Sequence, residues 1–111
     1  MSDLLERYVT FNNEGVRTRD FSSLLALFAP EAVMRLDGIA AGPFSAASAV
    51  AEAFREHPPD DELELLDHLA AGDRAVYGWS KRPGVPAGEL RIAERDGLIL
   101  ELLVSAYAQR S

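Results

Sequence analysis

Three segments in the first half of the chain space their apolar residues as amphipathic helices do. The first runs to about Arg17, and its apolar stripe consists of Leu4, Leu5, Tyr8, Val9, Phe11, Gly15 and Val16. The second follows Asp20, a suitable helix cap, and ends at Pro30; its stripe consists of Phe21, Leu24, Leu25 and Phe28. The third opens at Pro43 and ends at Pro58, with Ala46, Val50, Ala53, Phe54 and His57 on one face. Each predicted helix therefore needs a surface to cover.

Strand-like patterns occupy residues 32–36 and most of the second half of the chain. The four later strands are predicted at Glu62–Ala70, Arg74–Lys81, Gly88–Arg95 and Leu98–Ala108. The segments between them, and Asp37-Gly38 after the first strand, have compositions typical of tight turns. Three helices followed by an antiparallel meander predict an α+β fold in which a curved sheet wraps the helices.

The last predicted strand is apolar on both faces. Alternation places Leu98, Leu100, Leu102, Val104 and Ala106 on one face and Ile99, Leu103 and Tyr107 on the other. An antiparallel sheet in a small monomer normally has one polar face, so the second face is expected to pack on something. A homodimer through the outer face of the sheet is the favoured interpretation, and cover by a helix is the alternative.

Composition narrows the classes of protein and partner. A chain of 111 residues with 48% hydrophobic content predicts one domain spanning residues 1–111. The formal charge of −7 disfavours nucleic acid, because phosphate backbones repel an acidic surface. The absence of cysteine excludes disulfides and thiolate chemistry. No leader-like or membrane-length apolar run is visible, so we expect a cytoplasmic protein without membrane partners.

The order of these elements resembles a known superfamily over almost the full chain. The resemblance rests on ERYV in the first helix, LLALFAPEAVMRLDG at the helix-to-strand junction, ASAVAEAF, GDRAVYGW, and RDGLI before Tyr107. These pieces are similar to the nuclear transport factor 2-like superfamily, in particular its SnoaL-like branch of polyketide cyclases and ketosteroid isomerase. The resemblance implies a cone-shaped, cystatin-like α+β barrel around an apolar cavity, commonly dimeric through the outer face of the sheet.

The resemblance also implies positions for catalytic groups, and the chain departs from most of them. Tyr8 matches the family's oxyanion-hole tyrosine, but Leu36 stands at the position of the catalytic base and Arg91 near that of the second acid. Steroid-type isomerisation is therefore not supported. The epoxide hydrolases of the superfamily place an arginine between two aspartates, and no aspartate lies two residues from Arg91.

Three polar residues remain as candidates at the mouth of the cone. Asp37 and His68 are the candidate acid or base groups, although turn geometry explains Asp37 and a surface role explains His68. Arg91 could bind a ligand carboxylate or pair with Glu101 on the adjacent strand. The expected lining consists of Tyr8, Met34, Leu36, Phe54 and Trp79. Tyr77 shares a strand face with Trp79, and the pair could line a pocket or anchor an interface.

Three functions fit this pattern. The first is binding of a small hydrophobic or aromatic metabolite, the second is a cofactor-free acid/base enzyme, and the third is a dimerisation module whose cavity is filled by its own side chains. Two isolated histidines and no glycine-rich phosphate loop give no reason to expect a metal or another cofactor.

Overall fold

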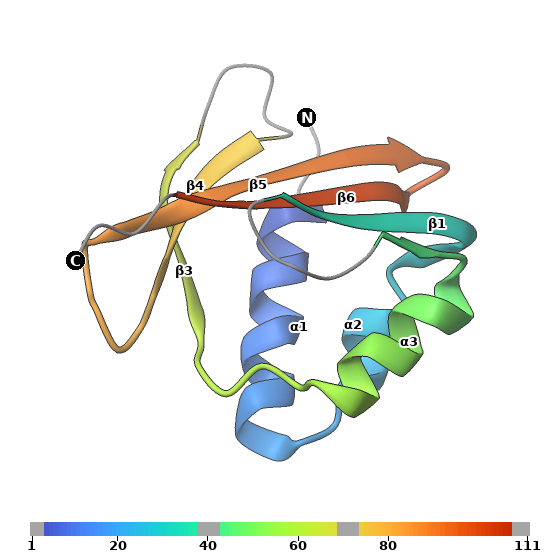
Figure 1. Cartoon of the computed structure of the whole chain (residues 1–111), viewed down its shortest axis with the longest axis horizontal. Helices are drawn as coiled ribbons and strands as arrows, with labels where there is room; N and C mark the ends of the chain where they lie inside the picture. The colour runs from blue at the N-terminus through green and yellow to red at the C-terminus, as the bar shows by residue number, and fades with distance from the viewer. Residues whose placement is uncertain (1–3, 38–42, 69–73, 108–111) are drawn as a thin grey trace.

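Six strands form one curved sheet, and three helices lie against one of its faces (Figure 1). The computed structural model describes residues 4–37, 43–68 and 74–107. The helices are α1 (Leu4–Thr18), α2 (Ser22–Leu25) and α3 (Ala47–Glu56). The strands are β1 (Phe28–Asp37), β2 (Phe44–Ser45), β3 (Leu63–His68), β4 (Arg74–Trp79), β5 (Pro86–Arg95) and β6 (Leu98–Ala106). This arrangement confirms the predicted α+β class.

The strand order is β2-β1-β6-β5-β4-β3, so the last four strands form the predicted antiparallel meander. One pairing differs from the prediction, because β1 runs parallel to β6 and makes the sheet mixed. The helices α1 and α2 precede β1 in sequence, and α3 follows it; all three lie on one face of the sheet (Figure 1). The long connection from β1 to β6, which includes α3 and the strands β2 to β5, lets β6 run in the same direction as β1.

The second predicted helix is wrong in length. It ends at Leu25, and Phe28 already belongs to β1, paired with Ile99 of β6. Leu27, Phe28 and Ala29 are all buried. An apolar run of this kind can form the buried face of a helix, but here it forms a turn and the start of a buried strand. Pro30 lies within β1, where the pairing register shifts: β1 advances five residues from Phe28 to Val33 while β6 advances two, from Ile99 to Glu101. Such an irregularity tolerates proline.

The third helix begins later than predicted, at Ala47, because Phe44 and Ser45 form the short strand β2 against Val33 and Met34. Its end at Glu56, with His57 as the capping residue, agrees with the sequence. Gly38 and the residues after it up to Gly42 lie outside the described residues, as do 69–73, so the turns predicted there are not described.

A bulge in β6 explains part of the two-faced apolar pattern. Between Ala93 and Glu94 of β5 the register skips Leu100 of β6, which shifts the alternation. Ile99, which simple alternation places on the outer face, is therefore fully buried, as is Leu102. Of the predicted outer apolar set, Leu103 and Tyr107 remain on the surface side, so the second face is less apolar than the sequence suggests.

The outer face of the sheet carries charges in rows across the strands. Arg74, Arg91, Leu103 and Arg35 form one row of paired positions, and Val76, Glu89, Ser105 and Asp37 form the next. The row on the other side of the arginines consists of Ala93, Glu101 and Val33. Ion pairs join neighbouring rows: Arg74 Nη2 lies 2.7 Å from Glu89 Oε1, and Arg35 Nε lies 2.9 Å from Glu101 Oε2.

Candidate functional site

An apolar cavity of about 280 Å³ lies between the helices and the inner face of the sheet. Its walls come from the three layers that the fold brings together: α1, α3 with the segment after it, and the concave side of strands β1 to β6. The lining residues are Tyr8, Asn12, Met34, Leu36, Phe44, Ala53, Phe54, His57, Pro59, Leu63, Tyr77, Trp79, Leu90 and Val104.

Strand alternation and helical spacing place these side chains on one surface. Met34 and Leu36 are two residues apart on β1, as are Tyr77 and Trp79 on β4, so each pair points to the same face. Tyr8 and Asn12 are four residues apart on α1 and share one side of the helix. The periodicities that build the core thus also build the cavity.

Burial along the wall locates the mouth of the cavity. Tyr8, Asn12, Met34, Tyr77 and Leu90 are buried and form the deep part. The exposed His57 and the half-buried residues of the rim lie around the opening; these are Leu36, Phe44, Ala53, Pro59, Trp79 and Val104. A ligand would therefore enter near the end of α3 and the end of β4.

Aromatic rings support the wall on two sides. Tyr77 and Trp79 meet edge to face, with ring centroids 5.6 Å apart and an interplanar angle of 84°. The ring of Phe54 packs against Phe21, at a centroid distance of 5.5 Å. Both Tyr77 and Trp79 line the cavity, which answers the question that the sequence left open about this pair.

Tyr8 places a phenol on the deep wall. Its side chain is 4% exposed, and burial raises the pKa of the phenol, with a further rise from the nearby Tyr77. Loss of the proton would place a charge in an apolar surrounding, so Tyr8 stays neutral at physiological pH. A neutral phenol can donate one hydrogen bond and accept others, but it is not a base.

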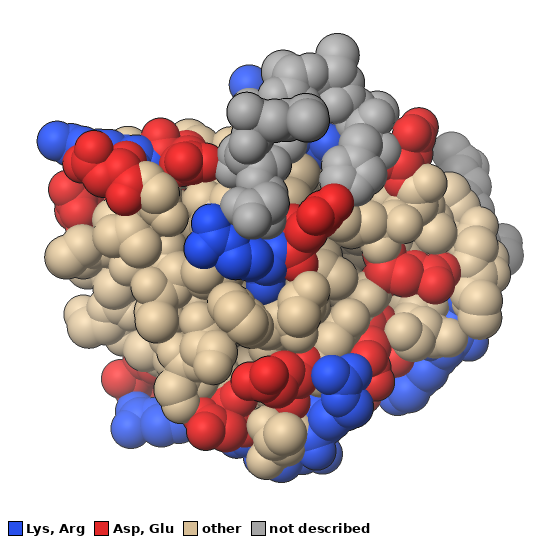
Figure 2. Space-filling model, turned by 180° about the vertical axis from the view of Figure 1, so that it is seen from behind, with Lys and Arg blue, Asp and Glu red and all other residues tan. Residues whose placement is uncertain are grey.

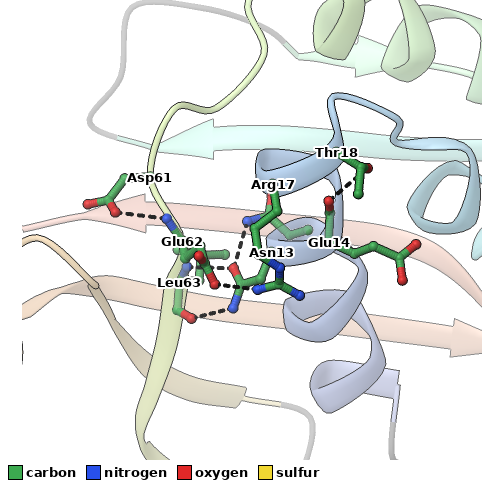
Figure 3. Close-up of polar contacts among 8 residues, drawn as sticks. Asn13, Glu14, Arg17, Thr18, Asp61, Glu62 and Leu63 are labelled. Atoms are coloured by element: carbon green, nitrogen blue, oxygen red, sulfur yellow. Dashed lines mark hydrogen bonds and ion pairs between the residues drawn. The ribbon is translucent and has the colours of Figure 1, made fainter.

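Asn12 is the second polar group on the deep wall, and it is only 2% exposed. Its Nδ2 donates to Oδ1 of Asn13 at 3.3 Å. Asn13 in turn holds β3: its Oδ1 accepts the Leu63 N–H at 2.7 Å, and its Nδ2 donates to the Leu63 carbonyl at 2.8 Å (Figure 3). We call these two hydrogen bonds between Asn13 and Leu63 the clamp. Next to the clamp, Arg17 donates to Glu62 at 2.7 Å (Figure 3).

Five of the residues that the sequence proposed for ligand contact lie on this wall: Tyr8, Met34, Leu36, Phe54 and Trp79. Arg91 does not, because its side chain is exposed in the arginine row of the outer face. Its expected partner Glu101 pairs with Arg35 instead. Asp37 is exposed and lies on the face opposite to Leu36, as strand alternation predicts.

His68 ends β3, where its backbone pairs with Ala75 of β4. Its side chain lies outside the described part of the structure. Asp37, on the opposite face of β1, does not join the lining residues either. The described wall of the cavity contains no aspartate or glutamate.

Sequence reasoning did not propose these lining residues: Asn12, Phe44, Ala53, His57, Pro59, Leu63, Leu90 and Val104. The missed signal for Asn12 is its spacing, four residues after Tyr8 and on the same helical stripe. A polar residue on an apolar stripe is either partnered or directed to a ligand. Phe44 could not be found because β2 itself was not predicted.

Some kinds of site find no support in the described residues. No group of three or more His, Asp or Glu side chains within them could hold a metal ion. Among the helices described, none is long and apolar enough to cross a membrane.

A curved sheet covered by three helices around an apolar cavity defines the cystatin-like or nuclear transport factor 2-like fold. The family model of the SnoaL-like domain matches residues 5–100, and the chain therefore belongs to this family. A comparison with curated proteins finds no match.

Solved structures with the same fold have low sequence identity to this chain. RV0760c from Mycobacterium tuberculosis, in complex with estradiol-17β-hemisuccinate, has 19% identity and a TM-score of 0.62, with 98% of this chain and 95% of that chain covered. A computationally designed 17-OHP binder has 19% identity and a TM-score of 0.63, with 99% and 94% covered. A protein from Sphaerobacter thermophilus has 22% identity and a TM-score of 0.68, with 96% and 95% covered.

Proposed function

We propose that the protein binds a small hydrophobic molecule with fused or aromatic rings in the cavity between α1, α3 and the sheet. The observation that carries this proposal is an apolar cavity that is open at its rim and has polar groups in its deep part, Tyr8 and Asn12. A mostly apolar wall with few polar groups is the common composition of small-molecule sites.

The size of the cavity supports a ligand of modest size. Its volume of about 280 Å³ lies just below the roughly 300–1,000 Å³ typical of ligand pockets. Two proteins of the same fold take steroid-type ligands: RV0760c is in complex with estradiol-17β-hemisuccinate, and the designed protein is a 17-OHP binder. Steroids and smaller fused-ring compounds are therefore the first ligands to test.

Binding is favoured over acid/base catalysis by the composition of the wall. Proton transfer at carbon needs a group of suitable pKa within hydrogen-bond reach of the substrate. The described wall holds no carboxylate, Tyr8 is a neutral phenol, and His57 lies exposed at the rim as the helix cap. A filled cavity, as expected of a pure dimerisation module, does not match the open volume between Phe54 and Trp79.

Trp79 offers a direct test, because it is the single tryptophan of the chain and lines the cavity. Titration with estradiol, 17-OHP and 2-naphthol should change its fluorescence in a saturable way. The same compounds should raise the melting temperature, since a ligand that binds the folded state stabilises it. If no compound of the set shifts either signal, the proposal fails.

We also propose that two copies pair through the outer face of the sheet. A two-fold axis between the arginine row and the row of Glu89 and Asp37 would place each basic row over the partner's acidic row. Figure 2 shows one side of the molecule, on which acidic and basic groups alternate with uncharged areas, so that side is mixed rather than uniformly acidic.

The dimer proposal predicts an association that weakens with salt, because screening reduces attraction between exposed charges. Sedimentation velocity at low and high NaCl measures this effect. Arg91→Glu should give monomers at both salt concentrations, whereas Arg17→Glu, on α1, should associate as the unchanged protein does. A monomer at low salt in the unchanged protein would contradict the proposal.

A further inference from the structure

We propose that Asn12 makes the cavity selective for ligands that carry a hydrogen-bond donor, such as a hydroxyl or N–H group. This inference rests on the proposed ligand-binding function and adds the chemical class of the ligand. It follows from the direction in which the Asn12 amide is held, and that direction is fixed by a chain of hydrogen bonds that begins at the backbone of β3.

The first step is the orientation of Asn13. The backbone N–H of Leu63 can only donate, so the atom that it contacts at 2.7 Å must be the Asn13 carbonyl oxygen. The Leu63 carbonyl can only accept, so the Asn13 amide nitrogen must face it, at 2.8 Å. Both contacts agree, and they fix the Asn13 side chain in one orientation (Figure 3).

The second step is the orientation of Asn12. Because the Asn13 oxygen is an acceptor, the atom of Asn12 that contacts it at 3.3 Å must be the amide nitrogen. The Oδ1 atom of Asn12 is then directed elsewhere. Within the described residues, every fully buried side-chain nitrogen or oxygen has a hydrogen-bond partner. Asn12 Oδ1 accepts no hydrogen bond from a described residue, so it keeps some open surface, which on this proposal faces the cavity that Asn12 lines.

The third step concerns the ligand. An amide oxygen on an apolar wall accepts a hydrogen bond from water when the cavity is hydrated. A ligand that displaces this water without replacing its hydrogen bond leaves a buried acceptor unsatisfied, which is costly. Tyr8 lies one turn before Asn12, about 6 Å along the helix axis. A ligand hydroxyl between the two can donate to Asn12 and accept from Tyr8.

The test compares three probes with one ring system: naphthalene, 2-naphthol and 2-methoxynaphthalene. Their sizes bracket the hydroxyl compound, and among them 2-naphthol alone can donate. Trp79 fluorescence and isothermal titration calorimetry on the unchanged protein should show 2-naphthol binding about tenfold more tightly than its methyl ether. Asn12→Leu, which keeps the size of the side chain, should remove this preference.

Tyr8→Phe is the matched comparison, because a phenol can donate to both the hydroxyl and the ether oxygen. This variant should weaken both oxygenated probes and keep the preference for 2-naphthol. Equal binding of 2-naphthol and its ether to the unchanged protein would overturn the role of Asn12 and leave ligand binding intact. If none of the three probes binds, the proposed function and this inference both fail. The comparison in the unchanged protein decides the point even if a variant does not fold.

Discussion

Single polar residues on the deep wall affect stability and ligand binding, because few hydrogen-bond partners surround them there. Tyr8 and Asn12 lie on the stripe of α1 that faces the core, where most neighbours are apolar. A buried polar group without a partner costs about 1–3 kcal/mol, so its presence calls for water or a ligand. The same burial affects how Tyr8 titrates.

Tyr8 should make the protein sensitive to alkaline pH. Burial raises the pKa of Tyr8 above its usual 10.0, so above pH 10 the folded state holds a proton that the unfolded state has released. The free energy of unfolding then falls as pH rises, by up to about 1.4 kcal/mol per pH unit for this group. Urea unfolding between pH 9 and pH 11 should show a shallower fall for Tyr8→Phe.

Tyr107→Phe is the comparison for that experiment. Desolvation and the nearby Glu89 also raise the pKa of Tyr107, but this residue is exposed and water can solvate its phenolate, so its loss should change the slope less. Parallel profiles for the unchanged protein and Tyr8→Phe would contradict the deep burial of the phenol.

Among the individual residues that line the cavity, the sequence predicted some and missed others, for physical reasons. Met34 and Leu36 lie two residues apart on the strand predicted at residues 32–36, and the family resemblance pointed to Tyr8 and Leu36. Asn12 was missed because the direction of its amide depends on Asn13, and Asn13 is in turn held by the backbone of Leu63 on the distant strand β3. Periodicity assigns a face, but it does not identify the partner.

Between the helices, Gly15 of α1 allows a close approach to the ring of Phe21. A Cβ at this position would lie 2.2 Å from Cδ1 of Phe21, which packs on Phe54. Gly15→Ala would gain about 1 kcal/mol of helix propensity, but overpacking of a core typically costs about 1–3 kcal/mol. We expect a net loss of about 1 kcal/mol in thermal or urea unfolding.

The double variant Gly15→Ala with Phe21→Leu tests the cause of that loss. If the ring causes the clash, the two changes should cost less together than the sum of their separate effects. A Gly15→Ala protein that is more stable than the unchanged protein would show that Phe21 moves away at little cost.

The clamp from α1 to β3 should stabilise the edge of the sheet. β3 is the last strand in the sheet order, and Asn13 bonds both backbone groups of Leu63 as a neighbouring strand would. Asn13→Ala should destabilise the protein by about 1–3 kcal/mol and speed amide hydrogen exchange at Leu63.

Thr18→Ala serves as the control for the clamp, because its hydroxyl donates within α1, to the carbonyl of Glu14 (Figure 3). This variant should leave exchange at Leu63 unchanged. Equal exchange rates at Leu63 in Asn13→Ala and the unchanged protein would show that the clamp does not hold β3.

The elements that the sequence predicted well are those with local signals. α1 and the four strands of the meander have clear periods and turn residues at their ends. The length of α2 was wrong because the run from Leu24 to Phe28 suits a helix and a buried strand equally. The parallel pairing of β1 with β6 depends on contacts far apart in sequence, which a local pattern does not carry.

For the molecule as a whole, an open cavity is a compromise between stability and binding. Each CH₂ group that would fill part of the cavity would add about 0.8 kcal/mol of hydrophobic stabilisation to the folded state, and the open cavity lacks this contribution. A structure that keeps about 280 Å³ open is therefore less stable than one that fills it. Proteins commonly retain such costs at functional sites.

Filling the cavity should raise stability and remove binding in one step. Ala53 lies on α3 at the rim of the cavity, half-buried, and Ala53→Leu would extend an apolar side chain into the open space. We expect a gain of about 1–2 kcal/mol in the free energy of unfolding. Binding of 2-naphthol, followed by Trp79 fluorescence, should weaken at least tenfold.

Ala49→Leu is the control, since Ala49 is half-buried on the same helix but does not line the cavity. Greater stability with unchanged binding would place the ligand elsewhere, because a side chain that fills the site must compete with any ligand there.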